Sequence, residues 1–514
     1  MHSPVSPVLK CSRAGDSTHA LVPFNVMRQR QGGWRSARHV ARPPQPASVD
    51  PTLPPATPPR RVPVPHGTRG ERLRRGVAAG TAAVAHAAAT TTRAQWSIAF
   101  VGVLAYVYAA VTYGLPIVGP SIVIALLGLA LERVGIVVPV FLVIFALFVA
   151  WAGAGYSTSY EPSTTFDQTI VLAKVLLIAF VIVNVTRSSW RVRAFMIFFL
   201  ACFAAYPTRG TLVNYFLAGY TVFGRALWNF IYGNSNDLAA LTFFPLSLSV
   251  ALAVTEKKGW VRNAALIGVG VLPLMILLTQ SRGALIALVV TGLLFFMTHA
   301  KGKRLKSLLI AAAASIVILP LVPSSAWQRF SNMGALTNSA TIGQADPEGS
   351  AEARYNIWRV ARVIIAENAV SGIGLGAYPR AHATYAPRVS VPLAAIGFRD
   401  THSTYFNVAA ETGIPGLVLF LGMIGTVAVS CERVRRRAKG TKWSEQLLAL
   451  ELGLLAFLLA GIFGSFAKLS FLYIQLAVMW AVADTATREI AAEAGAPSLR
   501  SAGPTARLER VATA

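Results

Sequence analysis

Three polar side chains stand out in a largely apolar chain because their types suit the handling of a phosphate ester. Arg282 lies in TQSRGAL between two apolar stretches, and Arg354 lies in EARYNIW within a long polar segment. His402 lies in RDTHSTYFN, directly before a further apolar stretch. A guanidinium group offers a planar fork of donors that fits phosphate oxygens. A histidine at a helix start feels the positive end of the helix dipole, which favours the neutral form that a general base requires.

Each of these residues also has a simpler structural interpretation. Arg282 would be an anchor that extends its charge to interfacial water, and Arg354 would belong to the solvated face of an amphipathic helix over residues 351–366. A lone histidine such as His402 is usually structural. Together, the three residues fit one reaction. A neutral histidine would deprotonate an acceptor hydroxyl while two arginines stabilise a leaving diphosphate.

Other catalytic motifs are missing from the sequence. It has no Asp-x-Asp pair in the long polar segment, no Walker loop and no His-Glu-x-x-His set. The glycines of GIGLGA, Gly372, Gly374 and Gly376, have the wrong spacing for a dinucleotide loop, so they predict a turn after the amphipathic helix. We therefore expect chemistry without a metal or another cofactor.

Composition identifies the environment that must hold these residues. The chain has 514 residues, of which 54% are hydrophobic and 13% charged, whereas soluble domains carry roughly 25% charged residues. Repeated long apolar runs predict an integral membrane protein. The net charge of +26 is explained by cations in short loops and in the N-terminal segment rather than by nucleic-acid binding. Three widely separated cysteines have neither metal nor disulfide spacing.

The apolar runs predict an all-α fold with about twelve transmembrane helices. We expect the spans near residues 97–114, 116–132, 135–154, 168–186, 192–206, 237–255, 263–279, 283–299, 306–323, 403–430, 446–464 and 469–485. The run at 192–206 is short, and residues 207–236 suggest a re-entrant or interfacial piece.

Loop charge predicts the orientation of these spans. Arginine and lysine recur in every second loop and are almost missing from the loops between, and cytoplasmic loops are the ones that carry such an excess. Both termini are therefore expected in the cytoplasm. The same alternation places residues 324–402 outside, as a large, partly helical extracytoplasmic loop between the ninth and tenth spans.

Three regions follow from this organisation. Residues 1–95 form a basic Pro/Arg/Ala-rich tail that we expect to be disordered and cytoplasmic. Residues 96–486 form the membrane domain, including the loop 324–402. Residues 487–514 form a cytoplasmic C-terminal tail.

Four motifs, in order, resemble the O-antigen ligase and polymerase superfamily. GNSNDLAALTFF resembles its Asn-containing start of a span, and TQSRGALIALVV resembles its Ser-Arg-Gly signature. EARYNIWRVARVIIAENAVSGIGLGAY resembles the Arg-x-x-x-Trp helix and Gly-x-Gly turn of its large periplasmic loop. HSTYFNVAAETGIPG resembles its His-Asn motif followed by Glu-x-Gly-x-x-Gly, with Ser403 where the superfamily commonly has Asn. The resemblance covers roughly residues 97–485.

The resemblance implies a metal-independent transferase with the membrane-embedded C-type glycosyltransferase fold. Such enzymes of the bacterial plasma membrane move a glycan from undecaprenyl diphosphate to an acceptor on the extracytoplasmic side. By the matching motifs, Arg282 and Arg354 would bind the donor diphosphate, and His402 would be the base or would orient the acceptor. The supporting residues would be Asn236, Ser281, Glu411, Gly413 and Gly416, the last three in the packing of the tenth span.

The acceptor stays open at this point. Ligases join the glycan to the lipid A core of lipopolysaccharide, polymerases extend another lipid-linked repeat, and related enzymes glycosylate proteins. A lipid-linked glycan flippase or another transporter would also fit about twelve spans, although the chain shows no internal repeat of half-molecules. A membrane scaffold would leave the three candidate residues unexplained.

Overall fold

The computed structural model describes residues 96–112, 114–132, 135–298, 309, 312, 316, 319–331 and 350–495. The basic tail, most of the expected ninth span and residues 332–349 lie outside this part. Within it the chain is helical and forms no strand; the single extended pairing joins Val222 to Arg225. The all-α class expected from the sequence is therefore confirmed for the described residues.

Seven helices in the described part are long and apolar enough to cross a membrane, and they identify a membrane protein. They span Val140–Thr158 (α4 with a short 3₁₀ turn), Pro162–Val185 (α5), Ser189–Leu217 (α6 with its continuation), Ser235–Thr255 (α8), Trp260–Leu278 (α9), Thr404–Arg437 (α16) and Lys442–Phe463 (α17 with a 3₁₀ turn). Three apolar helices are shorter: α2 (Ile98–Val111), α3 (Val118–Leu131) and α10 (Arg282–Thr298). The final helix, α18, covers Ser470–Gly495. The described part of the chain therefore does not confirm the expected count of about twelve spans.

The expected fifth span continues beyond its predicted end. Its helix runs from Ser189 to Leu217 and includes two π-helical stretches, Ala204–Thr208 and Val213–Leu217. Pro207 lies in the first stretch, and a proline removes one backbone donor and crowds the preceding turn. The wider turn takes up this disruption without ending the helix.

Small residues allow close helix packing in the bundle. A β-carbon on Gly102 or Gly128 would fall within 3 Å of the backbone of the facing helix of the α2–α3 pair. A β-carbon on Gly453 of α17 would similarly overlap Ser247 of α8. Helices in membranes associate through such close contacts because lipid supplies little hydrophobic drive between them.

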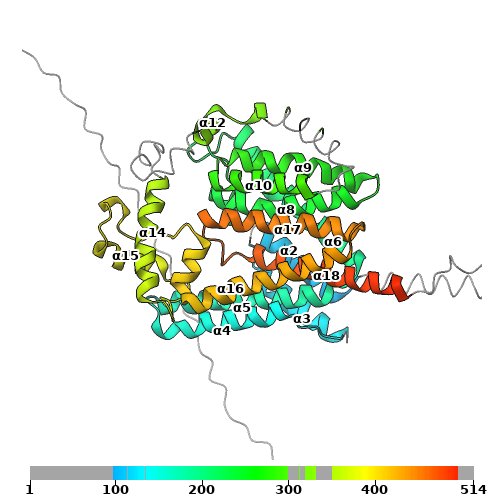
Figure 1. Cartoon of the computed structure of the whole chain (residues 1–514), viewed down its shortest axis with the longest axis horizontal. Helices are drawn as coiled ribbons and strands as arrows, with labels where there is room; N and C mark the ends of the chain where they lie inside the picture. The colour runs from blue at the N-terminus through cyan, green and yellow to red at the C-terminus, as the bar shows by residue number, and fades with distance from the viewer. Residues whose placement is uncertain are drawn as a thin grey trace, which may run out of the picture. The chain divides into compact units, whose positions relative to one another are not determined.

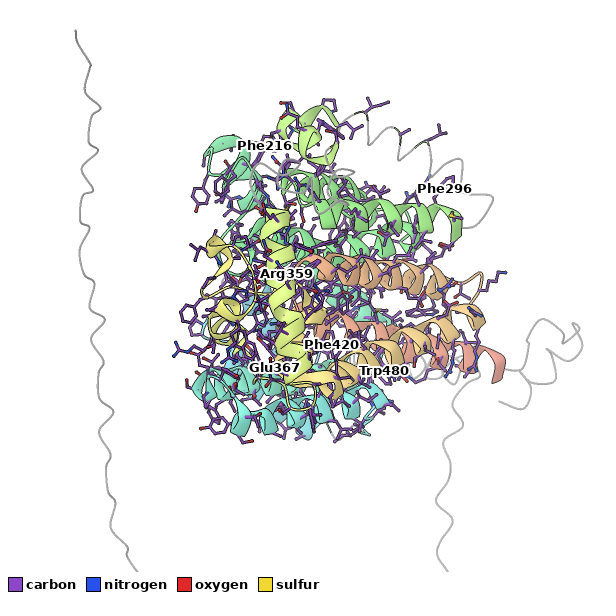
Figure 2. The ribbon with its side chains drawn as sticks, turned by 60° about the vertical axis from the view of Figure 1, so that its left-hand side comes forward. Phe216, Phe296, Arg359, Glu367, Phe420 and Trp480 are labelled. Carbon is purple, nitrogen blue, oxygen red and sulfur yellow. The ribbon has the colours of Figure 1, made fainter. Side chains whose placement is uncertain are left out.

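The two ends of the bundle differ in their residues. At one end, loop arginines meet carboxylates of neighbouring helices: Arg193 lies 2.6 Å from Glu256, and Arg187 lies 3.7 Å from Asp484. At the other end, α14 (Ser350–Glu367) runs across the ends of the long helices, with α15 (Tyr378–Tyr385) beside it (Figure 1). Figure 2 marks the course of α14 by Arg359 and Glu367.

A small core of its own holds α14 and α15 together. It contains Ile357, Val360 and Ile364 from α14, and Tyr378 and Tyr385 from α15. The amphipathic helix expected near residues 351–366 is therefore present, and its apolar face is buried against α15 and the start of α16.

Helix α16 is interrupted at Gly413, whereas the sequence predicted an unbroken span. Gly413 has φ 68° and ψ −178°. The segment after α14 takes the place of the missing helical turn. The Ile373 and Gly374 N–H groups donate to the carbonyls of Ala410 and Glu411, each at 3.0 Å, and the Ile414 N–H donates to Ala369 at 2.7 Å. The GIGLGA glycines form the expected turn, since Gly372, Gly374 and Gly376 all have positive φ.

We predict that Gly413→Ala strongly destabilises the protein. A β-carbon there would lie 2.1 Å from the Val370 carbonyl oxygen, in a left-handed backbone conformation. Together these effects are expected to cost roughly 2–4 kcal/mol. Thermal unfolding in detergent should show a clear loss of midpoint temperature. The matched controls are Gly422→Ala and Gly425→Ala in the same helix, where a β-carbon meets nothing within 4 Å. An unchanged midpoint for Gly413→Ala would contradict the structural role of the break.

Candidate functional site

Arg282 is the first residue of α10 and follows an irregular turn. Gln280 in that turn has φ 52°, a value that non-glycine residues seldom adopt. Its side-chain amide donates to the Gly224 carbonyl at 2.9 Å and to Ser325 Oγ at 3.3 Å. Arg282 itself is half-buried, and its Nε donates to the Arg329 carbonyl at 3.3 Å. The arginine is thus held where α9 ends, against α12 (Ser324–Ser331).

Asn236 reaches the same turn through a second arginine. Arg225 donates from Nη2 to Asn236 Oδ1 and from Nε to the Thr279 carbonyl, each at 2.8 Å. The first turn of α8 is thereby linked to the residues just before Arg282. Ser281 is buried in the turn, with its N–H 3.4 Å from Thr279 Oγ1.

His402 lies in a tight turn before α16. Its φ is 48°, and both of its neighbours, Thr401 and Ser403, are buried. Thr401 Oγ1 lies 2.8 Å from Ser465 Oγ, and Thr404 Oγ1 donates to the Gly464 carbonyl at 2.7 Å. With this left-handed backbone conformation, the His402 side chain is 39% exposed, although the side chains on either side of it are buried. The imidazole therefore remains accessible on a rigid turn.

An aromatic pair brings the three candidate regions together. Trp358, one turn after Arg354 on α14, donates from Nε1 to the Thr401 carbonyl at 2.9 Å. The Trp358 ring stacks on Phe463 with centroids 6.3 Å apart. A β-carbon on Gly283, next to Arg282, would lie 2.6 Å from Phe463. The segments that carry Arg282, Arg354 and His402 therefore meet at the Trp358–Phe463 pair, although they come from three separate elements.

One known family is similar to this part of the chain. The sequence profile of the O-antigen ligase family matches residues 264–421, which include Arg282, Arg354 and His402. The matched stretch is thus similar to an O-antigen ligase domain. The match confirms the superfamily resemblance and extends from α9 into the first half of α16. A search of curated proteins returned no match.

Electrostatics within the ligase domain favour a neutral His402. Burial of the imidazole lowers its pKa below the usual 6.5, and the charges of Arg354 and Arg399 lower it further. Asp400 acts in the opposite direction: its Oδ2 lies 3.8 Å from His402 Nδ1 and favours the imidazolium. Since burial is the largest effect, the net shift is downward, and the ring can accept a proton at neutral pH.

Glu411, Gly413 and Gly416 lie deeper in α16 than His402. The Glu411 side chain is 1% exposed, accepts from Asn407 Nδ2 at 2.9 Å and lies 3.4 Å from Lys468 Nζ. A β-carbon on Gly416 would meet Thr412 and Trp151. These residues make packing and hydrogen-bond contacts around the helix break.

Several residues near the candidate site were not singled out from the sequence. Asp400 and Arg399 act on His402 electrostatically, and both occur in RDTHS, where their proximity to the histidine was a usable signal. Asp237 in the first turn of α8 lies within electrostatic range of Asp400. Arg225 gave no such signal, because its contacts lie far along the chain.

In the described part of the chain, no group of three His, Cys, Asp or Glu residues could hold a metal ion.

We predict that Asp400→Asn lowers the pKa of His402. The substitution removes the carboxylate that favours the imidazolium, while burial and the two arginines continue to favour the neutral ring. Diethyl pyrocarbonate reacts with neutral imidazole, so labelling of the His402 peptide falls as the ring is protonated. The pH at which labelling is half of its maximum should be lower in Asp400→Asn than in the wild type. Mass spectrometry of that peptide across pH provides the measurement. Asp167→Asn is the control, and a midpoint that rises in Asp400→Asn would contradict the assignment.

Proposed function

We propose that the protein transfers or polymerises a glycan carried on undecaprenyl diphosphate, with an acceptor hydroxyl as the nucleophile. The O-antigen ligase domain supports glycan transfer of the ligase or polymerase type in general. The observation that carries the finer proposal is that the segments bearing Arg282, Arg354 and His402 meet at Trp358 and Phe463, with a histidine whose surroundings favour its neutral form.

The roles follow from the chemistry of each group. Arg282 and Arg354 bind the diphosphate, since guanidinium groups donate to several phosphate oxygens and neutralise the charge that develops as it leaves. The acceptor oxygen attacks the anomeric carbon, and the bond from that carbon to the diphosphate oxygen breaks. The hydroxyl proton passes to His402, at the ring nitrogen that does not face Asp400. Charge stabilisation comes from the arginines, so the proposed reaction needs no metal.

The charged ends of the bundle support an orientation. Cations at and just before the starts of helices gather at the end away from α14: Arg187, Arg193 and Lys442 all pair with carboxylates there. Cytoplasmic loops carry the excess of Lys and Arg. We therefore place this end in the cytoplasm of a bacterial cell, with both termini, and place α14, α15 and the candidate site on the extracytoplasmic face of the plasma membrane.

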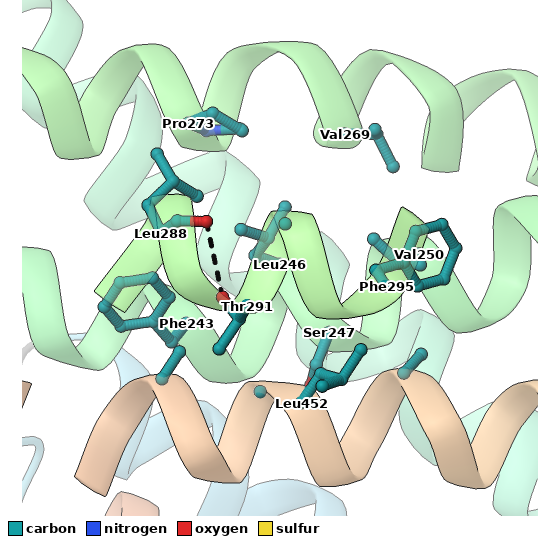
Figure 3. A pocket seen from close by; sticks show the side chains of 14 residues that line it. Phe243, Leu246, Ser247, Val250, Val269, Pro273, Leu288, Thr291, Phe295 and Leu452 are labelled. Atoms are coloured by element: carbon teal, nitrogen blue, oxygen red, sulfur yellow. Dashed lines mark hydrogen bonds between the residues drawn. The ribbon is translucent and has the colours of Figure 1, made fainter. Parts of the chain in front are cut away.

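An apolar cavity offers room for part of the polyprenyl tail. It has a volume of about 150 Å³ and lies between α8, α9, α10 and α17 (Figure 3). Its two hydroxyl groups are already satisfied: Ser247 donates to the Phe244 carbonyl and Thr291 to the Ala287 carbonyl, each at 2.7 Å. The lining that remains is hydrocarbon, which fits isoprene units and excludes a sugar.

We predict that Arg282→Ala and Arg354→Ala each reduce glycan transfer roughly 10²–10³-fold, and that His402→Ala reduces it roughly 10²–10⁴-fold. Each variant would be expressed in a strain lacking the gene, at equal protein levels, and the glycan that accumulates on the lipid carrier would be measured. Single repeats would identify a polymerase, and finished chains a ligase.

Arg362→Gln is the matched control for these variants, because Arg362 is exposed on the same helix as Arg354. It should restore transfer to about the wild-type level. If His402→Ala and Arg282→Ala membranes transferred glycan as fast as wild-type membranes, the site assignment would be wrong. Movement of lipid-linked glycan across proteoliposomes without transfer would indicate a flippase instead.

We also predict that Gly292→Leu discriminates donors by tail length. Gly292 lines the apolar cavity, and a β-carbon there meets nothing within 4 Å, so the leucine side chain would fill the space without a clash. Gly292 lies ten residues after Arg282 on α10, or about 15 Å along the helix. Transfer from a full-length polyprenyl donor should fall roughly tenfold, whereas a donor with a two-isoprene tail should be unaffected. Gly270→Leu on α9, which is also uncrowded, is the control. An equal loss with both donors would exclude a tail site here.

A further inference from the structure

A second cavity lies at the basic end of the bundle, away from the candidate active site. Its volume is about 580 Å³, within the range of roughly 300–1,000 Å³ that is usual for small-molecule sites. It is formed where α2 begins, α3 and α5 end, and α6 begins. The lining residues are Trp96, Ser97, Ile98, Gly128, Leu131, Glu132, Asn184, Val185, Arg187, Ser188 and Arg191.

The polar wall of this cavity is built from fixed side chains. Asn184 clamps the segment before α4, accepting from the Val137 N–H at 2.7 Å and donating to the Val137 carbonyl at 3.0 Å. Arg191 donates to the Val185 carbonyl at 2.9 Å and lies 3.7 Å from Glu132 Oε2. Arg187 donates from Nη1 to the Gly135 carbonyl at 2.8 Å. The charged groups are thus held in place before any ligand arrives.

Two buried atoms of the wall still lack hydrogen bonds within the described part of the chain: Arg187 Nε and Glu132 Oε1. Asp484 Oδ2 is 3.7 Å from Arg187 Nε, too far for a hydrogen bond, and it already accepts from Arg488 at 2.6 Å. A buried polar atom without a hydrogen-bond partner is energetically unfavourable. Both atoms belong to side chains that line the cavity, so the protein compensates the charges of Arg187 and Glu132 only in part.

The opposite rim of the cavity is apolar and faces outward. Trp96, Ile98 and Leu131 are 54%, 57% and 72% exposed, and the Trp96 ring packs edge-on against Trp190 with centroids 4.9 Å apart. Tryptophan is enriched at the membrane–water boundary. A ligand in this cavity would therefore meet charge at its inner side and hydrocarbon at its outer side.

We propose that this cavity binds a phospholipid whose head group carries a phosphate and a primary ammonium. The phosphate is attracted by the guanidinium groups of Arg187 and Arg191, and the ammonium by the Glu132 carboxylate. The acyl chains lie along Ile98 and Leu131. This assignment is independent of the proposed glycan transfer, because it uses none of the residues of that site and lies at the other end of the bundle.

The balance of charge separates this head group from others. The lining holds two cations, Arg187 and Arg191, and one anion, Glu132, so it offers partners to both the phosphate and the ammonium of a zwitterion. An anionic glycerol head group would leave Glu132 Oε1 without a charged donor. A choline head group has an ammonium without N–H donors, so it would satisfy the phosphate side alone.

The test uses the full-length protein, purified in detergent and stripped of lipid, with native mass spectrometry as the readout of bound lipid. The probes are phosphatidylethanolamine, phosphatidylcholine and phosphatidylglycerol with matched acyl chains. We expect phosphatidylethanolamine to bind as one tight equivalent, roughly tenfold or more tightly than the other two, since hydrogen bonds to charged groups are among the stronger ones.

The variants separate the two halves of the head group. Glu132→Gln should abolish the preference for phosphatidylethanolamine over phosphatidylcholine, and Arg187→Gln should weaken all three lipids. Glu256→Gln is the matched control: it removes the ion pair with Arg193 at the same end of the bundle, outside the cavity, and should keep the wild-type preference.

Three results would overturn the proposal: equal binding of the three lipids by the wild type, an unchanged preference in Glu132→Gln, or a lost preference in Glu256→Gln. A fourth arm adds soluble glycerophosphoethanolamine. We expect it to compete poorly because it cannot use the apolar rim. Displacement at a concentration equal to that of the lipid would assign the cavity to a free phosphate ester and would also overturn the lipid assignment.

Discussion

Three backbone hydrogen bonds across the break of α16 hold the candidate site onto the bundle. A helix that breaks within or near a membrane exposes N–H and C=O groups that hydrocarbon cannot satisfy. Here the segment after α14 supplies the partners, with Ile373 and Gly374 donating and Ala369 accepting. The same bonds fasten α14 and α15 to the membrane helices. The orientation of Arg354 relative to His402 therefore depends on how one transmembrane helix is interrupted.

Much of this arrangement could be predicted from local sequence. Charged residues are rare in this chain, so Arg282 and Arg354 were conspicuous, and the amphipathic period over residues 351–366 correctly predicted α14. The glycine run predicted a turn because its three glycines can adopt positive φ without strain. The proximity of the candidate residues was another matter. It depends on Phe463 meeting both Trp358 and the start of α10, and no local pattern reports contacts between segments so distant in the chain.

Other features lay beyond local reasoning for physical reasons. Hydropathy marks apolar stretches but not where a helix changes its winding, so the π-helical continuation to Leu217 was placed outside the fifth span. The interruption at Gly413 was not predicted because hydropathy alone defined the span, although Gly413, Pro415 and Gly416 stand close together there. Arg225 looked like an ordinary loop cation, whereas the fold makes it a bridge between Asn236 and the Thr279 carbonyl. In each case, tertiary contacts decide what the residue does.

The opposing charges around His402 have a consequence for the order of events in the proposed reaction. Burial lowers the pKa of the imidazole most, Asp400 raises it, and Arg354 and Arg399 lower it further. An arriving diphosphate would neutralise part of the guanidinium charge and leave the effect of Asp400 in place. The histidine would then become a stronger base only once the donor occupies the site. An empty site would hold a poorly basic histidine, and substrate binding itself would prepare the group that accepts the proton.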